Sequence, residues 1–290
     1  MNGFLLIDKK AGWTSRDVVT KISHMFHEKK VGHSGTLDPF ATGLLIVSVG
    51  RATKANVCLE GLDKEYIATL KLGSRTLSGD FTNEKIEEKP IKKPAKEQIL
   101  SVFDSLTGPQ KQIPPMVSAV RYKGEKLMHL AMQGIEVDRP ARDINIYELE
   151  LLDFHDDEIT FRAKVSKGTY IRVLGEEIAQ RLDNLGHLIA LRRTNVGDFN
   201  VKDAIDITEV SEDKIIDSYE VLKKCMTIVE LNDEDALRAS HGVSFKGDLS
   251  QICDTILVAD KNHIIIALYK YQNGLFVCQR GINDYGNSSI

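Results

Sequence analysis

The residue with the clearest chemical potential is Asp38, the one carboxylate in the glycine-rich stretch VGHSGTLDPFATGLL. Three glycines of this stretch permit a positive φ or a close backbone approach, while Pro39 fixes its own φ and directs Asp38 toward an extended conformation. The glycines are Gly32, Gly35 and Gly43. This composition predicts a stiff turn that presents Asp38 at the lip of a cleft. The alternative is an Asx-turn, in which Asp38 bonds only to its own backbone.

Two further segments carry candidate side chains. In SKGTYIRVLGEE, an extended backbone over residues 169–173 would place Tyr170 and Arg172 on one face, where the arginine could pair with a carboxylate. The alternative is a surface arginine beside a half-buried core tyrosine. Tyr66 begins the alternating segment KEYIATLKLG, and aromatic residues in strands mostly serve packing. The residues alone therefore give three separate candidates: Asp38, the pair of Tyr170 and Arg172, and Tyr66.

Other chemistries fail on spacing. A phosphate-binding P-loop needs Gly-Lys-Ser/Thr, and residues 31–50 contain no lysine. A nucleophile elbow needs G-x-S-x-G, whereas GHSGT has Thr36 at the second glycine position. His33 and Asp38 lack a nearby third ligand for zinc, so we expect no metal site. A serine hydrolase that uses His33, Ser34 and Asp38 is an alternative. It would be excluded if a Ser34→Ala variant kept normal catalytic activity.

The elements that must position these residues follow from hydrophobic periodicity. Strands are predicted over residues 3–9, 43–50, 64–73, 144–154 and 158–166, and helices over 14–26, 95–108, 124–133 and 174–186. Thr14 and Asp17 form a predicted capping box, and His155-Asp156-Asp157 is a hairpin signal between two strands. Residues 74–94 are polar and predicted to be loops. Short strands separated by turn residues over 256–282 predict a small β domain.

Composition bounds the class of protein. A length of 290 residues, with 42% hydrophobic and 28% charged residues, predicts a soluble protein of two domains. The four cysteines are dispersed and form no CxxC pair, which favours a reducing cytoplasm over a disulfide framework. The apolar run FLLI is too short for a secretory signal and HIIIALY too short to span a bilayer, so we expect no membrane association.

The net charge of -4 is unevenly distributed. Residues 1–57 hold eight Lys/Arg against four Asp/Glu, a balance of +4, and residues 161–200 hold seven against four, or +3. Residues 201–260 hold six against fourteen, or -8. A basic face for RNA is one interpretation, and a solvated surface is the other.

Four blocks occur in order through about the first two hundred residues: GHSGTLDPFATGLL, KEYIATLKLGSRTLSGD, QIPPMVSAVRYKGEKLMHLAMQGIEV and VSKGTYIRVLGEEIAQRL followed by LRRTNVGDF. Together they resemble the TruB family of bacterial tRNA pseudouridine-55 synthases, where 55 is a tRNA position. Ser34 departs from the threonine common in that family. The resemblance implies an α+β pseudouridine synthase fold, with a mixed, largely antiparallel central sheet flanked by helices. It also implies a catalytic domain over 1–225, an RNA-binding insert at about 108–145, and a small β-rich PUA-like domain over 226–290.

The same resemblance assigns roles to individual side chains. Asp38 would be the catalytic aspartate and Arg172 its partner, while Tyr66 would stack on the target uracil and accept the C5 proton. Tyr170 would line the pocket and Leu191 would contact the base. His33 would fill the space left by the flipped nucleotide. The cations that would face phosphates from the insert are Lys111, Arg121 and Lys123.

The implied reaction is the isomerisation of a uridine in the tRNA T-loop to pseudouridine, with base flipping and without a cofactor. The implied enzyme is cytoplasmic and monomeric, takes the T-arm of tRNA as its partner, and needs no protein partner. Two alternatives are an RNA chaperone that binds tRNA without needing turnover and an RNA-guided pseudouridylase, whose members carry longer N-terminal extensions.

Overall fold

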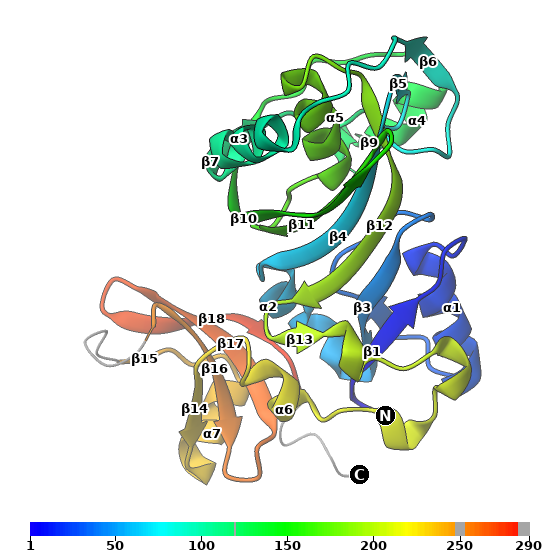
Figure 1. The fold of residues 1–290 in the computed structure, drawn as a ribbon. Coiled ribbons are helices and arrows are strands. Elements are labelled where there is room, and N and C mark those ends of the chain that lie inside the picture. Colours follow the sequence, from blue (N-terminus) through cyan, green and yellow to red (C-terminus); the bar gives the residue numbers. More distant parts are fainter. Residues whose placement is uncertain (119, 247–252, 284–290) are drawn as a thin grey trace. The chain divides into compact units, whose positions relative to one another are not determined.

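The computed structural model describes residues 1–118, 120–246 and 253–283, and the chain forms two compact units (Figure 1). Unit 1 contains Met1–Pro39, Gly43–Leu62 and the chain from Gly197 onward. Unit 2 contains Phe40–Thr42 and Asp63–Val196. Parts of the predicted insert and C-terminal domain, namely residues 119, 247–252 and 284–290, lie outside the described residues.

The first part of unit 1 joins three strands and a helix around the glycine-rich turn. Strand β1 (Gly3–Lys9) runs antiparallel to β3 (Thr42–Val49), and β2 (Val31–His33) also pairs with β3 in antiparallel register. Helix α1 (Ser15–Phe26) begins with the predicted capping box, because the Asp17 N–H donates to Thr14 Oγ1 at 3.0 Å and the Thr14 N–H donates to Asp17 Oδ2 at 2.8 Å. A 3-10 turn (Gly50–Ala55) and α2 (Asn56–Glu60) follow β3.

Unit 2 contains an antiparallel sheet in which β4 lies between β11 and β12 (Figure 1). The strand order is β12, β4, β11, β10, β7. Their bounds are β4 Lys64–Leu72, β7 Gly108–Gln112, β10 Arg142–His155, β11 Glu158–Val165 and β12 Gly186–Val196. The predicted hairpin of β10 and β11 is confirmed, with Asp156 at a φ of 50° in its turn.

Two helices of unit 2 pack on this sheet. Helix α3 (Lys96–Leu106) buries Phe103, whose ring meets that of Phe161 on β11 edge to face at 5.9 Å. Helix α5 (Ile171–Arg181) approaches the sheet so closely that a Cβ on Gly175 would lie 2.8 Å from Leu188 Cδ2. A side chain at residue 175 would therefore force Leu188 to move.

Three local predictions were wrong. The loop predicted over 74–94 contains β5 (Ser74–Thr76) paired with β6 (Lys85–Glu88); β6 is wholly exposed, so no apolar alternation marks it. The helix predicted from residue 124 begins later, as α4 (Leu127–Met132), after the short hairpin of β8 (Arg121–Tyr122) and β9 (Glu125–Lys126). Helix α5 begins at Ile171 rather than at residue 174.

A second sheet lies in the C-terminal part of unit 1, in the order β14, β16, β17, β18, β15. The bounds are β14 Ile228–Leu231, β15 Phe245–Lys246, β16 Thr255–Asp260, β17 Ile265–Gln272 and β18 Leu275–Gly281. Helix α7 (Asp233–Ser240) packs on it through Ala236 and Ala239. The connection from the first part contains β13 (Phe199–Asn200), three 3-10 turns (Val201–Asp203, Ile207–Glu209, Glu212–Lys214) and α6 (Ser218–Leu222).

The small β-rich C-terminal part predicted from the sequence is confirmed, and the domain boundary after residue 225 stays a prediction. Among the described residues, the helices are all too short or too polar to cross a membrane.

Candidate active site

The main chain on both sides of Asp38 is held by hydrogen bonds within unit 1. The Leu37 N–H donates to Ser15 Oγ at 2.9 Å, and the same hydroxyl donates to the Leu37 carbonyl at 3.2 Å. On the other side, the Pro39 carbonyl accepts from the Gly12 N–H at 2.9 Å. A side chain between two fixed residues is pre-organised, which is what a catalytic carboxylate requires.

Lys9 also stabilises this turn through hydrogen bonds. Its side chain is 1% exposed, and its ammonium group donates to the carbonyl oxygens of Lys10 (3.0 Å), Trp13 (2.7 Å) and Pro39 (3.3 Å). Three acceptors satisfy the three donors of a buried ammonium group. Neither Lys9 nor Ser15 had a predicted role, and the only sequence signal for either was its position between a strand end and a helix start.

The glycines act as the sequence predicts. Gly35 and Gly43 have φ values of 97° and 104°, which side chains rarely adopt. Gly32 serves close approach instead, because a Cβ there would lie 3.1 Å from Asn56 Nδ2. His33, at the end of β2, is half-buried, and its carbonyl accepts a long hydrogen bond of 3.5 Å from Asn56.

Arg172 is 4% exposed and is anchored within unit 2 by main-chain carbonyls. Its Nη1 donates to the Ser78 carbonyl at 2.5 Å, and its Nη2 donates to the Val117 carbonyl at 3.0 Å. Asp80 Oδ2 lies 3.8 Å from Nη1, so the positive charge is partly balanced. A guanidinium group held at two nitrogens has a fixed orientation.

The turn that contains Gly79 lies against both Arg172 and Glu176, which is one helical turn further along α5. Gly79 has a φ of 76°, which favours glycine, and a Cβ there would lie 3.2 Å from the Arg172 Cβ and 3.3 Å from Glu176 Oε1. Burial raises the pKa of Glu176, while Arg75 and Arg172 oppose that rise. The sequence analysis gave Glu176 no role, and its place within the amphipathic helix offered no signal for one.

The extended backbone considered for residues 169–173 is not found, so Tyr170 and Arg172 do not share a strand. Tyr170 is the N-cap residue of α5, with φ of −97° and ψ of 109°, and Arg172 lies in the first turn of the helix. The reason is that Ile171, Leu174 and Ile178 have helical spacing and are all buried. The side-chain amide of Gln112 fixes Tyr170, since its oxygen accepts from the Tyr170 N–H at 2.7 Å and its nitrogen donates to the Tyr170 carbonyl at 3.1 Å.

Tyr66 and Leu191 share one face of the unit 2 sheet. Tyr66 is directly opposite Arg193 on β12, and Leu191 is opposite Ala68. Residues two apart on a strand point to the same face, so the two are diagonal neighbours. Arg193, 1% exposed on this face, had no predicted role; its only signal was its position in the LRR sequence.

Helix α5 packs on this same face. A Cβ on Gly186 would lie 2.7 Å from Ala179 Cβ and 2.8 Å from Leu70 Cδ1, and Gly175 faces Leu188. One helical turn toward the start of α5 thus corresponds to about two strand residues along β12. Unit 2 therefore has Tyr66, Leu191 and helix α5 on one face of the sheet.

The predicted phosphate-binding cations are exposed on the insert. Lys111 on β7 pairs with Asp143 at 3.1 Å, with side-chain exposures of 76% and 87%. Arg121 donates to the Gly124 carbonyl at 2.7 Å, and the Lys123 ammonium lies 5.4 Å from the centre of the Tyr122 ring. Their contact with RNA stays a prediction.

Asp38 and His33 belong to unit 1, and the other predicted site residues belong to unit 2. The pairing of Asp38 with Arg172, and the roles of all nine predicted site residues, stay predictions. Within the described residues, His, Cys, Asp and Glu side chains form no group of three or more suited to a metal ion.

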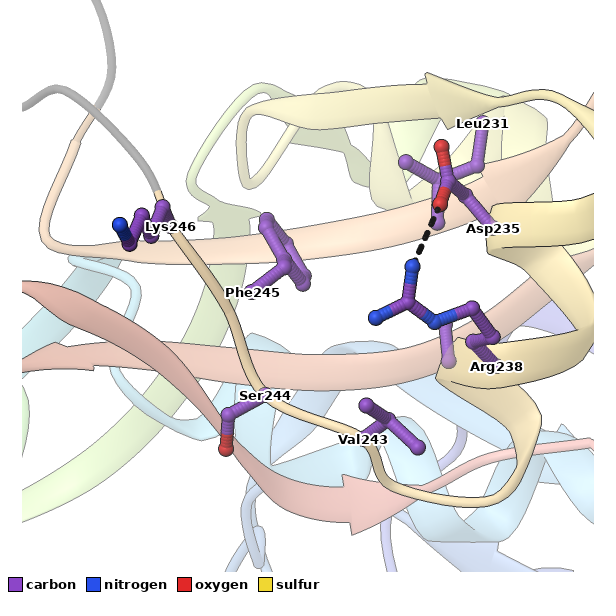
Figure 2. A pocket seen from close by; sticks show the side chains of 8 residues that line it. Leu231, Asp235, Arg238, Val243, Ser244, Phe245 and Lys246 are labelled. Carbon is purple, nitrogen blue, oxygen red and sulfur yellow. Dashed lines mark ion pairs between the residues drawn. The ribbon is translucent and has the colours of Figure 1, made fainter.

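The C-terminal part of unit 1 has a separate pocket with a volume of about 190 Å³ (Figure 2). It is lined by Leu231, Asp235, Arg238, Ala239, Val243, Ser244, Phe245 and Lys246. An ion pair of 3.6 Å joins Asp235 to Arg238 at its edge. None of the predicted site residues lines this pocket, so it is not part of the candidate active site.

Solved structures share the fold. A chain in the crystal structure of a Cbf5-Nop10-Gar1 complex matches with a TM-score of 0.74 and 24% identity, over 97% of this chain and 85% of that one. A chain in a structure of an H/ACA RNP bound to a substrate RNA containing 2'-deoxyuridine matches with a TM-score of 0.71 and 22% identity. The match covers 97% of this chain and 85% of that one. The pseudouridine synthase fold predicted from the sequence is confirmed.

Sequence comparisons define the family. The model described as TruB family pseudouridylate synthase (N terminal domain) matches residues 23–171. Relatives named tRNA pseudouridine synthase B include that of Hydrogenovibrio crunogenus, 38% identical over 83% of this chain and 80% of the relative. The tRNA pseudouridine synthase B of Francisella philomiragia is 37% identical over 97% of this chain and 94% of the relative. The chain belongs to the TruB family of pseudouridylate synthases, and is therefore an isomerase.

Proposed function

We propose that this enzyme converts the uridine at position 55, in the T-loop of tRNA, to pseudouridine. The observation that carries the proposal is the relationship to a protein named tRNA pseudouridine synthase B over 97% of the chain. The T-loop position comes from the sequence blocks that resemble the family.

The reaction moves a glycosidic bond. The bond from ribose C1' to uracil N1 breaks, a bond from C1' to C5 forms, the C5 proton leaves, and N1 gains a proton. We assign the anionic role to Asp38, which acts near C1' by addition there, by addition at C6, or by removal of the C2' proton. Each route needs an ionised carboxylate, and a nearby guanidinium group favours that form. The fixed main chain of Leu37 and Pro39 supports this assignment.

The target uridine must leave its stack at a cost of a few kcal/mol. We propose that Tyr66 stacks on the uracil and accepts the C5 proton, with about 1 to 3 kcal/mol from stacking. Tyr170 and Leu191 complete the pocket. Leu191 shares a sheet face with Tyr66, and Tyr170 is the N-cap of α5, the helix that packs on that face, which supports this assignment. His33 occupies the space that the nucleotide leaves.

Phosphate contacts supply the remaining affinity. We assign them to Lys111, Arg121 and Lys123, whose exposure on the insert suits contact with the backbone of the T-arm.

The test is release of tritium from unmodified tRNA that carries uridine tritiated at C5, with no guide RNA present. We expect the wild type to release tritium from position 55, and Asp38→Asn to bind the tRNA without releasing any. Asp156→Asn is the matched control, because Asp156 is exposed in a turn and asparagine tolerates its φ of 50°.

Other outcomes contradict the proposal. Tight binding without release by the wild type favours an RNA chaperone. Release only after a guide RNA is added favours an RNA-guided enzyme. Full activity of Asp38→Asn removes the assigned catalytic role of that carboxylate.

A further inference from the structure

Phe81 combines an exposed ring with a rigid main chain. Its side chain is 53% exposed, yet its N–H donates to the Leu188 carbonyl at 3.0 Å, and the Leu188 N–H donates to the Gly79 carbonyl at 2.9 Å. The carbonyl just before Phe81, that of Asp80, accepts from the Thr76 hydroxyl at 2.7 Å. The position of this aromatic residue is therefore determined on both sides.

The ring itself is restrained. It meets the buried ring of Phe40 edge to face, with 5.7 Å between centroids and 83° between planes. Leu77, in the same turn, is 52% exposed. A single exposed apolar side chain is ordinary, but two large ones on a turn held by so many hydrogen bonds form an apolar surface with a fixed shape.

This surface lies close to Arg172, one residue of the proposed site. The Asp80 carboxylate, next to Phe81 in the chain, lies 3.8 Å from Arg172 Nη1. Phe40, which contacts the Phe81 ring, follows Asp38 by two residues. An RNA whose target uridine reaches these residues has its neighbouring nucleotides near the Phe81 ring.

We propose that Phe81 stacks on an unpaired base adjacent to the target uridine, and so acts as a substrate-positioning residue. This inference rests on the proposed function. Extrusion of the uridine deprives its neighbours of a stacking partner, and a rigid aromatic face replaces that partner at little entropic cost. Because every base has a π face, the contact strengthens binding without reading a base edge.

Steady-state tritium release tests the proposal. We expect Phe81→Leu, which keeps apolar area but has no aromatic face, to raise KM for unmodified tRNA about 5- to 150-fold, or about 1 to 3 kcal/mol. We expect kcat to change less than about threefold, and Phe81→Tyr to restore KM to within about twofold of wild type. Leu152→Ala is the matched control, since Leu152 is 45% exposed on β10 and should leave both constants unchanged.

Fluorescence identifies the stacked base. A T-arm stem-loop with 2-aminopurine beside the target uridine should lose fluorescence on binding Asp38→Asn, and lose less on binding the double variant that also carries Phe81→Leu. Equal quenching by both proteins, or an unchanged KM for Phe81→Leu beside an active wild type, overturns this inference alone. A wild type that makes no pseudouridine overturns the proposed function and the inference with it.

Discussion

At the scale of single residues, the backbone next to Asp38 is held by a hydroxyl group more than twenty positions earlier in the chain. Ser15 both donates to and accepts from the backbone of Leu37, and its side chain is buried. Catalytic groups must be held to within about half an ångström of their working positions. Loss of this one hydroxyl would free the residue that precedes the carboxylate.

We therefore expect Ser15→Ala to lower kcat for tritium release at least tenfold while KM changes less, because the carboxylate loses its position rather than its charge. The free energy of unfolding should fall by about 1 to 3 kcal/mol, since two buried backbone groups lose a partner. Ser15→Thr, which keeps the hydroxyl, should recover most of kcat. Single-turnover kinetics and urea unfolding measure these effects.

A matched control is Ser48→Ala. Ser48 is fully buried on β3, but its hydroxyl has no hydrogen-bond partner within the described part of the chain. Its removal should therefore leave stability unchanged or slightly higher. If Ser15→Ala retained wild-type kcat, the hold on Leu37 would not matter for catalysis.

At the scale of elements, the sequence predicted most strands and helices because their apolar periodicity is local. The hairpin of β10 and β11 and the capping box of α1 are examples. The hydrogen bonds that fix the backbone at the predicted site residues could not be predicted from local periodicity. Ser15 lies 22 residues from Leu37, and Gln112 lies 58 residues from Tyr170, so each pair meets only once the chain has folded. The start of α5 was missed because Tyr170 and Arg172 read equally well as strand residues.

The two hydrogen bonds between Gln112 on β7 and the N-cap residue of α5 give a prediction at this scale. Gln112→Ala removes both hydrogen bonds that hold the main chain of Tyr170 at the helix start, so we expect KM for tRNA to rise several-fold as the pocket loosens. Gln110→Ala removes the hydrogen bonds that the Gln110 side chain donates to the carbonyls of Leu106 (3.1 Å) and Ser105 (3.5 Å), away from Tyr170, and should leave KM unchanged. Equal effects of the two variants on KM would contradict this role.

The end of α5 gives a prediction about pH. Hydrogen bonds from Lys89 and Lys92 lower the pKa of Asp183 to about 2. Because this pKa lies below the unfolded value, the ion pairs stabilise the fold above about pH 4, and that contribution is lost as the pH falls toward 2. The Tm difference between wild type and Asp183→Asn should therefore narrow from pH 5 to pH 3.

Asparagine suits this test, because it tolerates the φ of 55° at residue 183. Added salt should narrow the same Tm difference at pH 7, since the ion pairs are exposed. A Tm difference that is independent of both pH and salt would mean that the carboxylate acts through its backbone conformation instead.

At the scale of the whole molecule, an acidic protein must still bind a polyanion. Residues 201–260 carry a balance of -8, whereas residues 1–57 and 161–200 are basic. Salt screens exposed charges beyond about 10 Å at 0.1 M, so acidic residues farther than that from bound RNA do little to repel it. Affinity then depends on the few cations that touch phosphates rather than on net charge.

Salt dependence tests this directly. With Lys111, Arg121 and Lys123 all changed to alanine, the slope of log Kd against log salt concentration should fall by about 2, at about 0.7 per lost phosphate contact. The exposed Lys111–Asp143 pair offers little resistance to exchange for a phosphate. The matched control changes Lys214 and Lys223, exposed lysines of the acidic segment in similar ion pairs, and should keep the wild-type slope. An equal loss of slope in both proteins would mean that net charge, and not the insert, governs tRNA binding.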